Sequence, residues 1–333
     1  VGITCYTMTA PRVYEIADEF RKRGKKVVLG GYHPTAIPGE AGQHADGIIM
    51  GMAEASWPRL LNDAEKGKLK TIYERDTDFD MADVPPIRRN LIKHNPLSGA
   101  VQTTRGCTNR CEFWAISSFC QHGIKQRPIK NVVEEIKQIP NQLYVIHDPH
   151  LTTNRKYALN LFKAIETLDI IWFTALEPSF ADDKELVEAA ARSGLRSILL
   201  GIETPSRKSL SDQKKGHLDL DKLKDQIDKL HSFGIKIDSA MLFGFDDHDE
   251  SIWEETLEFV LEIGIDVSHG VVPIPFPGTE LYKKLKSDGR ITTEDWSKYD
   301  GTHLTYSHPK FSETDIYKGL MWFEREFNKR KVK

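Results

Sequence analysis

Short apolar segments alternate with amphipathic segments over the first 70 residues of the chain. Residues 1–4, 26–29 and 47–50 are mostly apolar and have the length of buried strands. Two segments between them place apolar residues on one helical face: Val13, Ile16, Ala17 and Phe20, then Trp57, Leu60, Leu61 and Ala64. This alternation predicts a parallel sheet, so residues 1–75 are expected to form a partial Rossmann-like α/β domain.

A segment of charged residues and prolines predicts a linker over residues 76–98. A second repeating pattern of helices and strands follows this segment. Three times a helical pattern ends at a glycine and a nearly continuous apolar strand follows, at Gly194, Gly234 and Gly264. Further strands are expected at 99–104, 142–147 and 170–176, with helices at 130–138 and 155–167.

Six strand–helix units over residues 99–285 predict a partial (β/α)6 barrel of the TIM type, open rather than closed. In such folds the reactive groups lie at the carboxyl ends of the strands. Residues 286–333 are expected to form a C-terminal extension that ends in a helix and packs on the barrel.

Composition excludes several classes of protein. The chain has 46 basic and 49 acidic residues among 333, for a net charge of −3, which argues against a nucleic-acid-binding protein. No apolar run reaches the ~20 residues of a membrane span. Four cysteines cannot form a disulfide framework, so a cytoplasmic location is expected. Because the chain begins at Val1, inside an expected strand, we expect a true N-terminal segment to be missing.

Three cysteines gather immediately after the first barrel strand, where the fold predicts an active site. Cys107, Cys111 and Cys120 lie within fourteen residues of one another. Thiolates in one loop suit an iron–sulfur cluster or zinc, although cysteine is also common as a small buried residue.

The segment RGCTNRCEFWAISSFC resembles the cluster loop of radical S-adenosylmethionine (SAM) enzymes, whose pattern is CxxxCxxC. The resemblance implies that Cys107 and Cys111 bind a 4Fe-4S cluster and that Phe113 lies against the adenine of SAM. The third ligand position holds Trp114, whose indole N–H cannot bind iron. Three alternatives stay open: Cys120 replaces the missing ligand, the protein forms no stable cluster, or Trp114 is a substitution or sequence error in an otherwise active enzyme.

Later motifs extend the resemblance over most of 99–285. They are the acidic loop of Asp148, the GIET element of Glu203, the FGF element of Gly244, and the PFPGTELY segment that begins at Pro275. The resemblance implies that these residues hold SAM. For Glu203 the alternative is a surface ion pair with Arg196 or Lys208.

The HDPH segment also permits a different class of function. His147, Asp148 and His150 could bind a divalent metal that activates water, as in a barrel metallohydrolase. The alternative is a turn in which Asp148 accepts hydrogen bonds from loop amides.

The N-terminal segment GGYHPT is similar to the latter part of the cobalamin-binding domain that precedes many radical SAM domains. This similarity implies cofactor contacts at Gly30 and Gly31, where the backbone can approach closely, and at Thr7 and Thr9. The opening part of that domain is not in the sequence, so cobalamin binding is doubtful for this chain. His33 is expected to be a turn histidine rather than a cobalt ligand.

Together these features imply a radical SAM enzyme of the cobalamin-associated subgroup. Such an enzyme cleaves SAM reductively to a 5′-deoxyadenosyl radical and transfers a methyl group to, or rearranges, an unreactive carbon. The implied partners are a small-molecule or lipid-like substrate and a reductant such as flavodoxin or ferredoxin. A catalytically silent protein that binds SAM or a partner is the alternative. Neither the catalytic residues nor the substrate can be assigned from the sequence.

Overall fold

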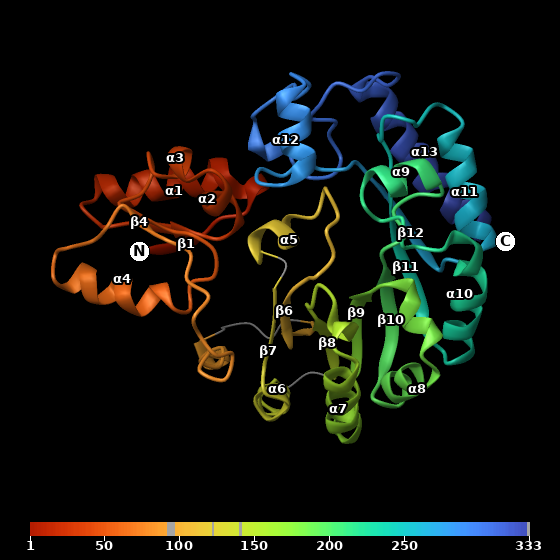
Figure 1. Ribbon diagram of the computed structural model, residues 1–333, viewed down its shortest axis with the longest axis horizontal. Coiled ribbons are helices and arrows are strands. Elements are labelled where there is room, and N and C mark those ends of the chain that lie inside the picture. Colours follow the sequence, from red (N-terminus) through yellow and green to blue (C-terminus); the bar gives the residue numbers. More distant parts are fainter. Residues whose placement is uncertain (92–96, 122, 140–141, 332–333) are drawn as a thin grey trace.

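The computed structural model describes residues 1–91, 97–121, 123–139 and 142–331. Within these ranges the chain forms two separate parallel sheets and a small antiparallel hairpin. The N-terminal sheet and the larger central sheet lie at opposite sides of the molecule, with the hairpin and its loop between them (Figure 1).

The N-terminal sheet has four parallel strands in chain order: β1 (Gly2–Thr4), β2 (Val28–Gly30), β3 (Gly47–Ile49) and β4 (Ile72–Tyr73). Its helices are α1 (Ala10–Lys22), α2 (Tyr32–Ala36), α3 (Pro38–Ala41) and α4 (Ser56–Glu65). Helices α1 to α3 cover one face and α4 covers the other (Figure 1). Strand β4 was not expected from the sequence, because only two residues of a charged segment pair with β3.

The central sheet has six parallel strands in the order β12-β11-β10-β9-β8-β5. Their bounds are β5 (Gly99–Val101), β8 (Leu143–Ile146), β9 (Ile171–Leu176), β10 (Leu195–Leu200), β11 (Lys236–Leu242) and β12 (Val267–Val271). Strands β5 and β12 are not paired with each other. The expected open (β/α)6 barrel is therefore confirmed.

Helices cover one face of the central sheet. They are α6 (Ile129–Lys137), α7 (Arg155–Ile165), α8 (Lys184–Arg192), α10 (Leu223–Ser232), α11 (Ile252–Glu262) and α13 (Glu313–Lys331), and they follow the outer arc of the sheet (Figure 1). Strand β9 shows the consequence, because Trp172, Thr174 and Leu176 are buried whereas the residues between them are more open.

The C-terminal extension contacts both sheets. Helix α13 packs on β12 and α11. Helix α12 (Glu280–Ser287) and the turn after it reach the N-terminal unit, where Trp296 and Tyr299 join the core around α1. The indole of Trp296 donates a hydrogen bond to Glu40 Oε1 at 2.9 Å. These aromatic residues therefore pack as part of the core.

No helix in the described ranges combines the length and apolar character needed to cross a membrane.

The helix-ending glycines allow a stability test. Gly194 has a φ of +100°, and a Cβ there would lie 1.8 Å from the carbonyl oxygen of Ile170. We expect Gly194→Ala to lower the free energy of unfolding by about 3 kcal/mol or more, because backbone must move. The control is Gly234→Ala, where φ is +71° but no atom lies within 4 Å of the added carbon. Only the left-handed backbone penalty of about 1–2 kcal/mol applies there. Urea unfolding of both variants checks this, and equal losses would contradict it.

Candidate active site

The cysteine loop is carried by a hairpin that the sequence did not predict. Strand β6 (Thr104–Gly106) pairs antiparallel with β7 (Ile124–Gln126), and the loop between them carries α5 (Ala115–Phe119). Gly106 stands immediately before Cys107 with a φ of +101°, and a Cβ there would lie 1.9 Å from the carbonyl oxygen of Gly123. Glycine is thus required for the two ends of the loop to approach.

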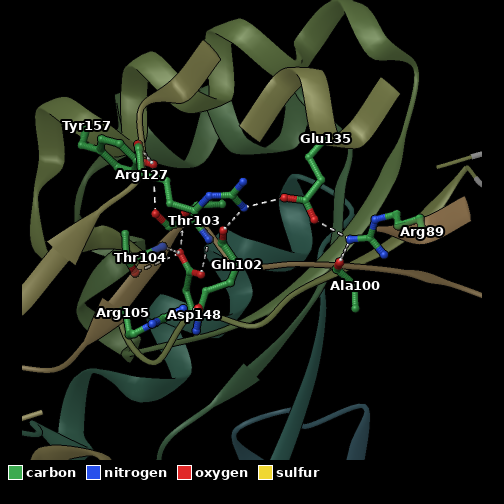
Figure 2. Close-up of polar contacts among 10 residues, drawn as sticks. All are labelled: Arg89, Ala100, Gln102, Thr103, Thr104, Arg105, Arg127, Glu135, Asp148 and Tyr157. Atoms are coloured by element: carbon green, nitrogen blue, oxygen red, sulfur yellow. Dashed lines mark hydrogen bonds and ion pairs between the residues drawn. The ribbon is translucent and has the colours of Figure 1, made fainter. Parts of the chain in front are cut away.

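Asp148 fastens the root of this hairpin to the end of β8 (Figure 2). Its carboxylate accepts hydrogen bonds from the backbone N–H of Thr103 at 2.7 Å, from that of Thr104 at 2.8 Å and from the Thr104 hydroxyl at 2.9 Å. The Thr103 hydroxyl donates a fourth. Asp148 is 3% exposed. A buried carboxylate is stable only when its oxygens are satisfied, so Asp148 fixes residues 103–104 in one place.

A second group of contacts holds the other side of the same root (Figure 2). The Tyr157 hydroxyl, on α7, donates toward the carbonyl oxygens of Arg127 and Thr103 at 2.8 and 3.2 Å. Glu135 is 3% exposed and pairs with Arg127 at 2.7 Å and with Arg89 at 2.5 Å. These ion pairs join the expected linker, the hairpin and α6. These contacts therefore hold the base of the hairpin in one position beside the site.

A charged group lies at the carboxyl ends of β9 and β10. Lys215 has a side chain that is 4% exposed and pairs with Glu203, and its Nζ lies 3.8 Å from Glu177 Oε1. The amide of Asn109, in the cysteine loop, donates to Glu177 Oε1 at 3.1 Å. Glu203 adopts a φ of +72°, which is uncommon for a residue with a side chain. The cysteine loop thus closes onto a buried lysine with two carboxylates.

The three cysteines lie in different surroundings. Cys107 is buried and Cys111 is half-buried. Burial raises the pKa of Cys111 to about 11, and the nearby charge of Lys215 opposes this. Burial likewise raises the pKa of Cys120 to about 11, but there Arg105 and Arg75 oppose it. Cys111 therefore lies near the Lys215 group, whereas Cys120 lies near Arg105 and Arg75; Cys107 is near both of these thiols.

Trp114 caps the start of α5, and Cys120 caps its end. Trp114 is 39% exposed. The two positions are six residues apart along the helix, or about 9 Å along the axis. Within the described ranges, no three His, Cys, Asp or Glu side chains are grouped so that they could hold a metal ion. The thiols of Cys107 and Cys111 lie toward the charged group, and the residue at position 114 supplies no third thiol.

Residues 101–260 match the model of the radical SAM superfamily. Bacteriochlorophyllide d C-8(2)-methyltransferase of Chlorobaculum tepidum is 31% identical, over 93% of this chain and 73% of that protein. The chain belongs to the radical SAM superfamily. Bacteriochlorophyllide d C-12(1)-methyltransferase of the same organism is 27% identical over 99% of this chain and 74% of that protein.

Solved structures support the same fold. The radical SAM methyltransferase TsrM of Kitasatospora setae, solved with cobalamin and a [4Fe-4S] cluster, matches 97% of this chain and 79% of its own with a TM-score of 0.74 and 15% identity. The cobalamin-dependent radical SAM enzyme OxsB matches 98% of this chain and 52% of its own, with a TM-score of 0.64 and 14% identity. The radical SAM sheet and the preceding α/β unit are both part of these matches.

Within this radical SAM fold, the motif residues take different positions. Phe113 is partly buried against the main core, and Pro275 is buried. The N–H of Gly244 donates to His248 Nδ1 at 3.3 Å, and its carbonyl accepts from Tyr306 at 2.8 Å. The segment after Pro275 contacts the cysteine loop, since the N–H of Leu281 donates to the carbonyl of Glu112 at 3.0 Å. The motifs are thus assembled around one loop.

Asp148, which was expected to hold SAM, lies at the root of the hairpin. All four of its hydrogen bonds are made within the chain and its side chain is buried, which suits a role in positioning the hairpin. Because the carboxylate of Asp148 is engaged in these hydrogen bonds, it is not available to bind the divalent metal of the metallohydrolase alternative. The partners suggested for Glu203 were wrong. Its partner is Lys215, while Lys208 pairs with Asp212.

In the N-terminal unit, the expected cofactor residues make contacts within the chain. Thr7 Oγ1 lies 3.4 Å from Nδ1 of His33, which is fully buried. The Thr9 hydroxyl donates to the carbonyl of Tyr6 at 3.0 Å. A Cβ on Gly31 would lie 3.0 Å from the Cys5 carbonyl oxygen, whereas Gly30 has room for one. Gly31 is therefore explained by chain packing. His33 is a core residue, not an exposed turn residue.

Sequence reasoning missed Lys215, Glu177 and Asn109. Glu177 directly follows an apolar strand, a position that could have marked it. Lys215 stands in a QKKG segment that resembles an ordinary exposed charged turn. Only its burial beside Glu203 distinguishes it from its neighbour Lys214.

The hairpin base yields a test of rigidity. We expect Tyr157→Phe to increase amide hydrogen exchange over residues 103–127, because the lost hydrogen bonds contribute about 1 kcal/mol of local stability. Tyr144→Phe is the matched control, since Tyr144 also donates to two carbonyls, at 3.0 and 3.2 Å, but outside the hairpin. Amide hydrogen exchange measured by mass spectrometry tests this prediction. Equal exchange over 103–127 in both variants would refute a special role for Tyr157.

His248 provides a pH test. It is 2% exposed, its Nε2 lies 3.3 Å from the Thr204 and Ser209 hydroxyls, and burial lowers its pKa to about 4 despite the nearby charge of Asp247. The unfolded chain takes up a proton near pH 6.5, but the folded chain does not. Stability from this group is therefore complete above pH 6.5 and decreases by about 3 kcal/mol as the pH falls to 4. In urea unfolding between pH 7 and 4, His248→Asn should show a shallower decline. An unchanged slope would show that His248 is not the cause.

Proposed function

We propose that this protein carries the site of a radical SAM methyltransferase for an extended apolar small molecule, with Trp114 in place of the third cluster ligand. One observation carries the proposal: Cys107 and Cys111 lie beside the Lys215 group at the carboxyl edge of an open six-stranded sheet. The methyltransferase names of the relatives in Chlorobaculum tepidum support the reaction. The names bacteriochlorophyllide and hopanoid support a large ring system as the acceptor.

The residues at this edge fit the amino-acid part of SAM. That part carries an ammonium and a carboxylate, and the site offers Glu203 and Lys215 as charges of opposite sign. Among the described residues, Gln213 Oε1 and His150 Nδ1 are buried here without hydrogen-bond partners, so polar groups stand ready for a ligand. We propose that Glu203 and Lys215 bind this part, and that Phe113, Gly244 and Pro275 contact the nucleoside.

The residues do not fit a cluster held by three thiolates. Cys107 and Cys111 are the proposed ligands, and Trp114 occupies the third position with a donor-only indole. Cys120 lies near Arg105 and Arg75, and Cys107 is also near it. Position 114 is therefore proposed to decide whether this chain forms a cluster, with relocation of the ligand to Cys120 and a silent protein as the other outcomes.

The fit to cobalamin is also incomplete. Thr7, Thr9 and Gly31 are engaged within the chain, so we derive no role for them in binding cobalamin. The division into residues 1–75, 76–98, 99–285 and 286–333 stays a prediction. We further propose a reducing, cytoplasmic setting with flavodoxin or ferredoxin as reductant, in keeping with four free cysteines.

Anaerobic reconstitution of the wild type and Trp114→Cys tests the proposal. We expect the variant to take up iron and sulfide equivalent to one [4Fe-4S] cluster per chain and to release 5′-deoxyadenosine when reduced with dithionite in the presence of SAM. The wild type should take up less than about a tenth as much, because ligand number decides cluster stability. Iron and sulfide analysis, absorbance and chromatography of the nucleoside give the result.

Cys120→Ala is the control. If the wild type forms a full cluster and Cys120→Ala abolishes it, Cys120 is the third ligand. The residue at position 114 then does not decide whether the cluster forms. If Trp114→Cys takes up no iron although it is folded, the proposal of a radical SAM site at this loop fails.

A further inference from the structure

The N-terminal sheet ends in a strand whose outer edge is free. Strand β4 is the last strand in the order β1-β2-β3-β4, and no strand of the described ranges lies beyond it. The carbonyls of Thr71 and Tyr73 accept hydrogen bonds from β3, at 2.9 and 3.0 Å. Because backbone groups alternate in direction along a strand, the N–H and C=O of Ile72 point away from β3. An edge with unpaired backbone groups is a template for another strand.

A groove of about 490 Å³ lies beside this edge. Arg59 and Asp63 of α4 line one side of the groove, and the residues of β4 line the other side together with Glu74 and Arg75. The side chain of Ile72 is 40% exposed, although isoleucine is usually buried. The edge of β4 is therefore accessible to another chain.

The charges around β4 are divided by sign about Ile72. Lys68 and Lys70 precede it, and Glu74 and Asp76 follow it, at every second position. In an extended segment such positions share one face. Lys70 and Glu74 are exposed, and neither has an ion-pair partner within the described part of the chain, whereas Asp76 pairs with an arginine of α4 at 2.7 Å.

This division favours a second copy of the same chain as the partner. In an antiparallel pair with Ile72 opposite its own counterpart, Lys70 of each copy lies opposite Glu74 of the other, and Lys68 lies opposite Asp76. A parallel pair would place like charges together. An antiparallel pair shifted by two residues would place Ile72 against a charge. Lysines on a free edge ordinarily prevent strand pairing, but in this register each lysine meets an acidic residue.

We propose that β4 pairs with β4 of a second copy in a two-fold symmetric, antiparallel dimer, so that the two N-terminal sheets become one continuous sheet. The same segment lies on both sides of the interface, as two-fold symmetry requires. Because only short strands meet, the interface is at the small end for protein dimers, and we expect a micromolar dissociation constant. The dimer needs neither a cluster nor SAM, so it goes beyond the proposed function and does not depend on it.

The edge of β4 is connected to the cysteine loop by one side chain. Arg75 directly follows Glu74, and it donates to the carbonyl of Phe119, in α5, at 2.7 Å. Pairing of the edge would reduce local opening of the backbone that carries Arg75. The dimer would thus restrain a residue that contacts the end of α5.

Charge exchange at Lys70 and Glu74 tests the dimer in sedimentation experiments at low salt, with the full chain and without iron, sulfide or SAM. Lys70→Glu and Glu74→Lys should each raise the dissociation constant at least about tenfold, because two repulsive pairs replace two attractive ones. The double variant restores opposite charges and should dimerise like the wild type. Lys156→Glu is the matched control, because Lys156 is an exposed lysine of α7 without an ion-pair partner in the described ranges, and it should leave the dimer unchanged.

An equimolar mixture of Lys70→Glu and Glu74→Lys gives a sharper result. One copy then carries only acidic residues at the two positions and the other only basic ones, so we expect heterodimers where neither variant dimerises alone. Native mass spectrometry with one variant isotopically labelled measures them. A monomeric wild type overturns the proposal, and so does a dimer that neither exchange weakens. A mixture or a double variant that stays monomeric overturns it too.

Amide hydrogen exchange distinguishes strand pairing from charge attraction alone. The N–H of Ile72 faces away from β3, so only the dimer protects it. At a concentration where the wild type is dimeric, we expect slower exchange over residues 70–74 in the wild type than in Lys70→Glu. Exchange over β1, at the other edge of the same sheet, should be equal in the two proteins. Equal exchange over residues 70–74 overturns pairing through β4. The reconstitution of Trp114→Cys is a separate measurement, so either result can fail without the other.

Discussion

The buried carboxylate of Asp148 is the constraint on which the site depends. It receives two backbone and two hydroxyl donors from two consecutive threonines, and it shares no hydrogen bond with solvent-exposed groups. A carboxylate removed from water needs every one of these donors, so the segment before the hairpin has a single stable position. The cysteine loop begins at Cys107, only three residues after Thr104, so its first residues are held in place as well.

The fixed root explains why the two ends of the loop face different environments. The first end lies against Lys215 and its carboxylates, while the far end of α5 meets the N-terminal unit. There Arg75 donates to the carbonyl of Phe119 at 2.7 Å, and the Phe119 ring lies 4.3 Å from that of Tyr32. The short helix between them is thus held at both ends. Trp114 and Cys120 therefore lie at opposite ends of a helix that is held in place.

The open face of the central sheet gives the protein a second feature that its sequence conceals. Strand β9 is apolar on the face away from the helices, whereas β11 places Lys236 and Asp238 there, and helices cover only the other face. Apolar surface is retained where water reaches it, at a free-energy cost that grows with the exposed area.

The sequence by itself determined the order of the strands and helices and the family. Periodicity reports which side of an element is buried, and the left-handed glycines report where helices end, so elements such as β9 and β10 were found within a few residues. Tertiary structure alone decided which charges meet. Lys215 and Lys214 are adjacent and chemically identical, and only folding buries one of them beside Glu203. The β6–β7 hairpin was equally hidden, because it depends on long-range contacts to Asp148 and Tyr157 rather than on a local pattern.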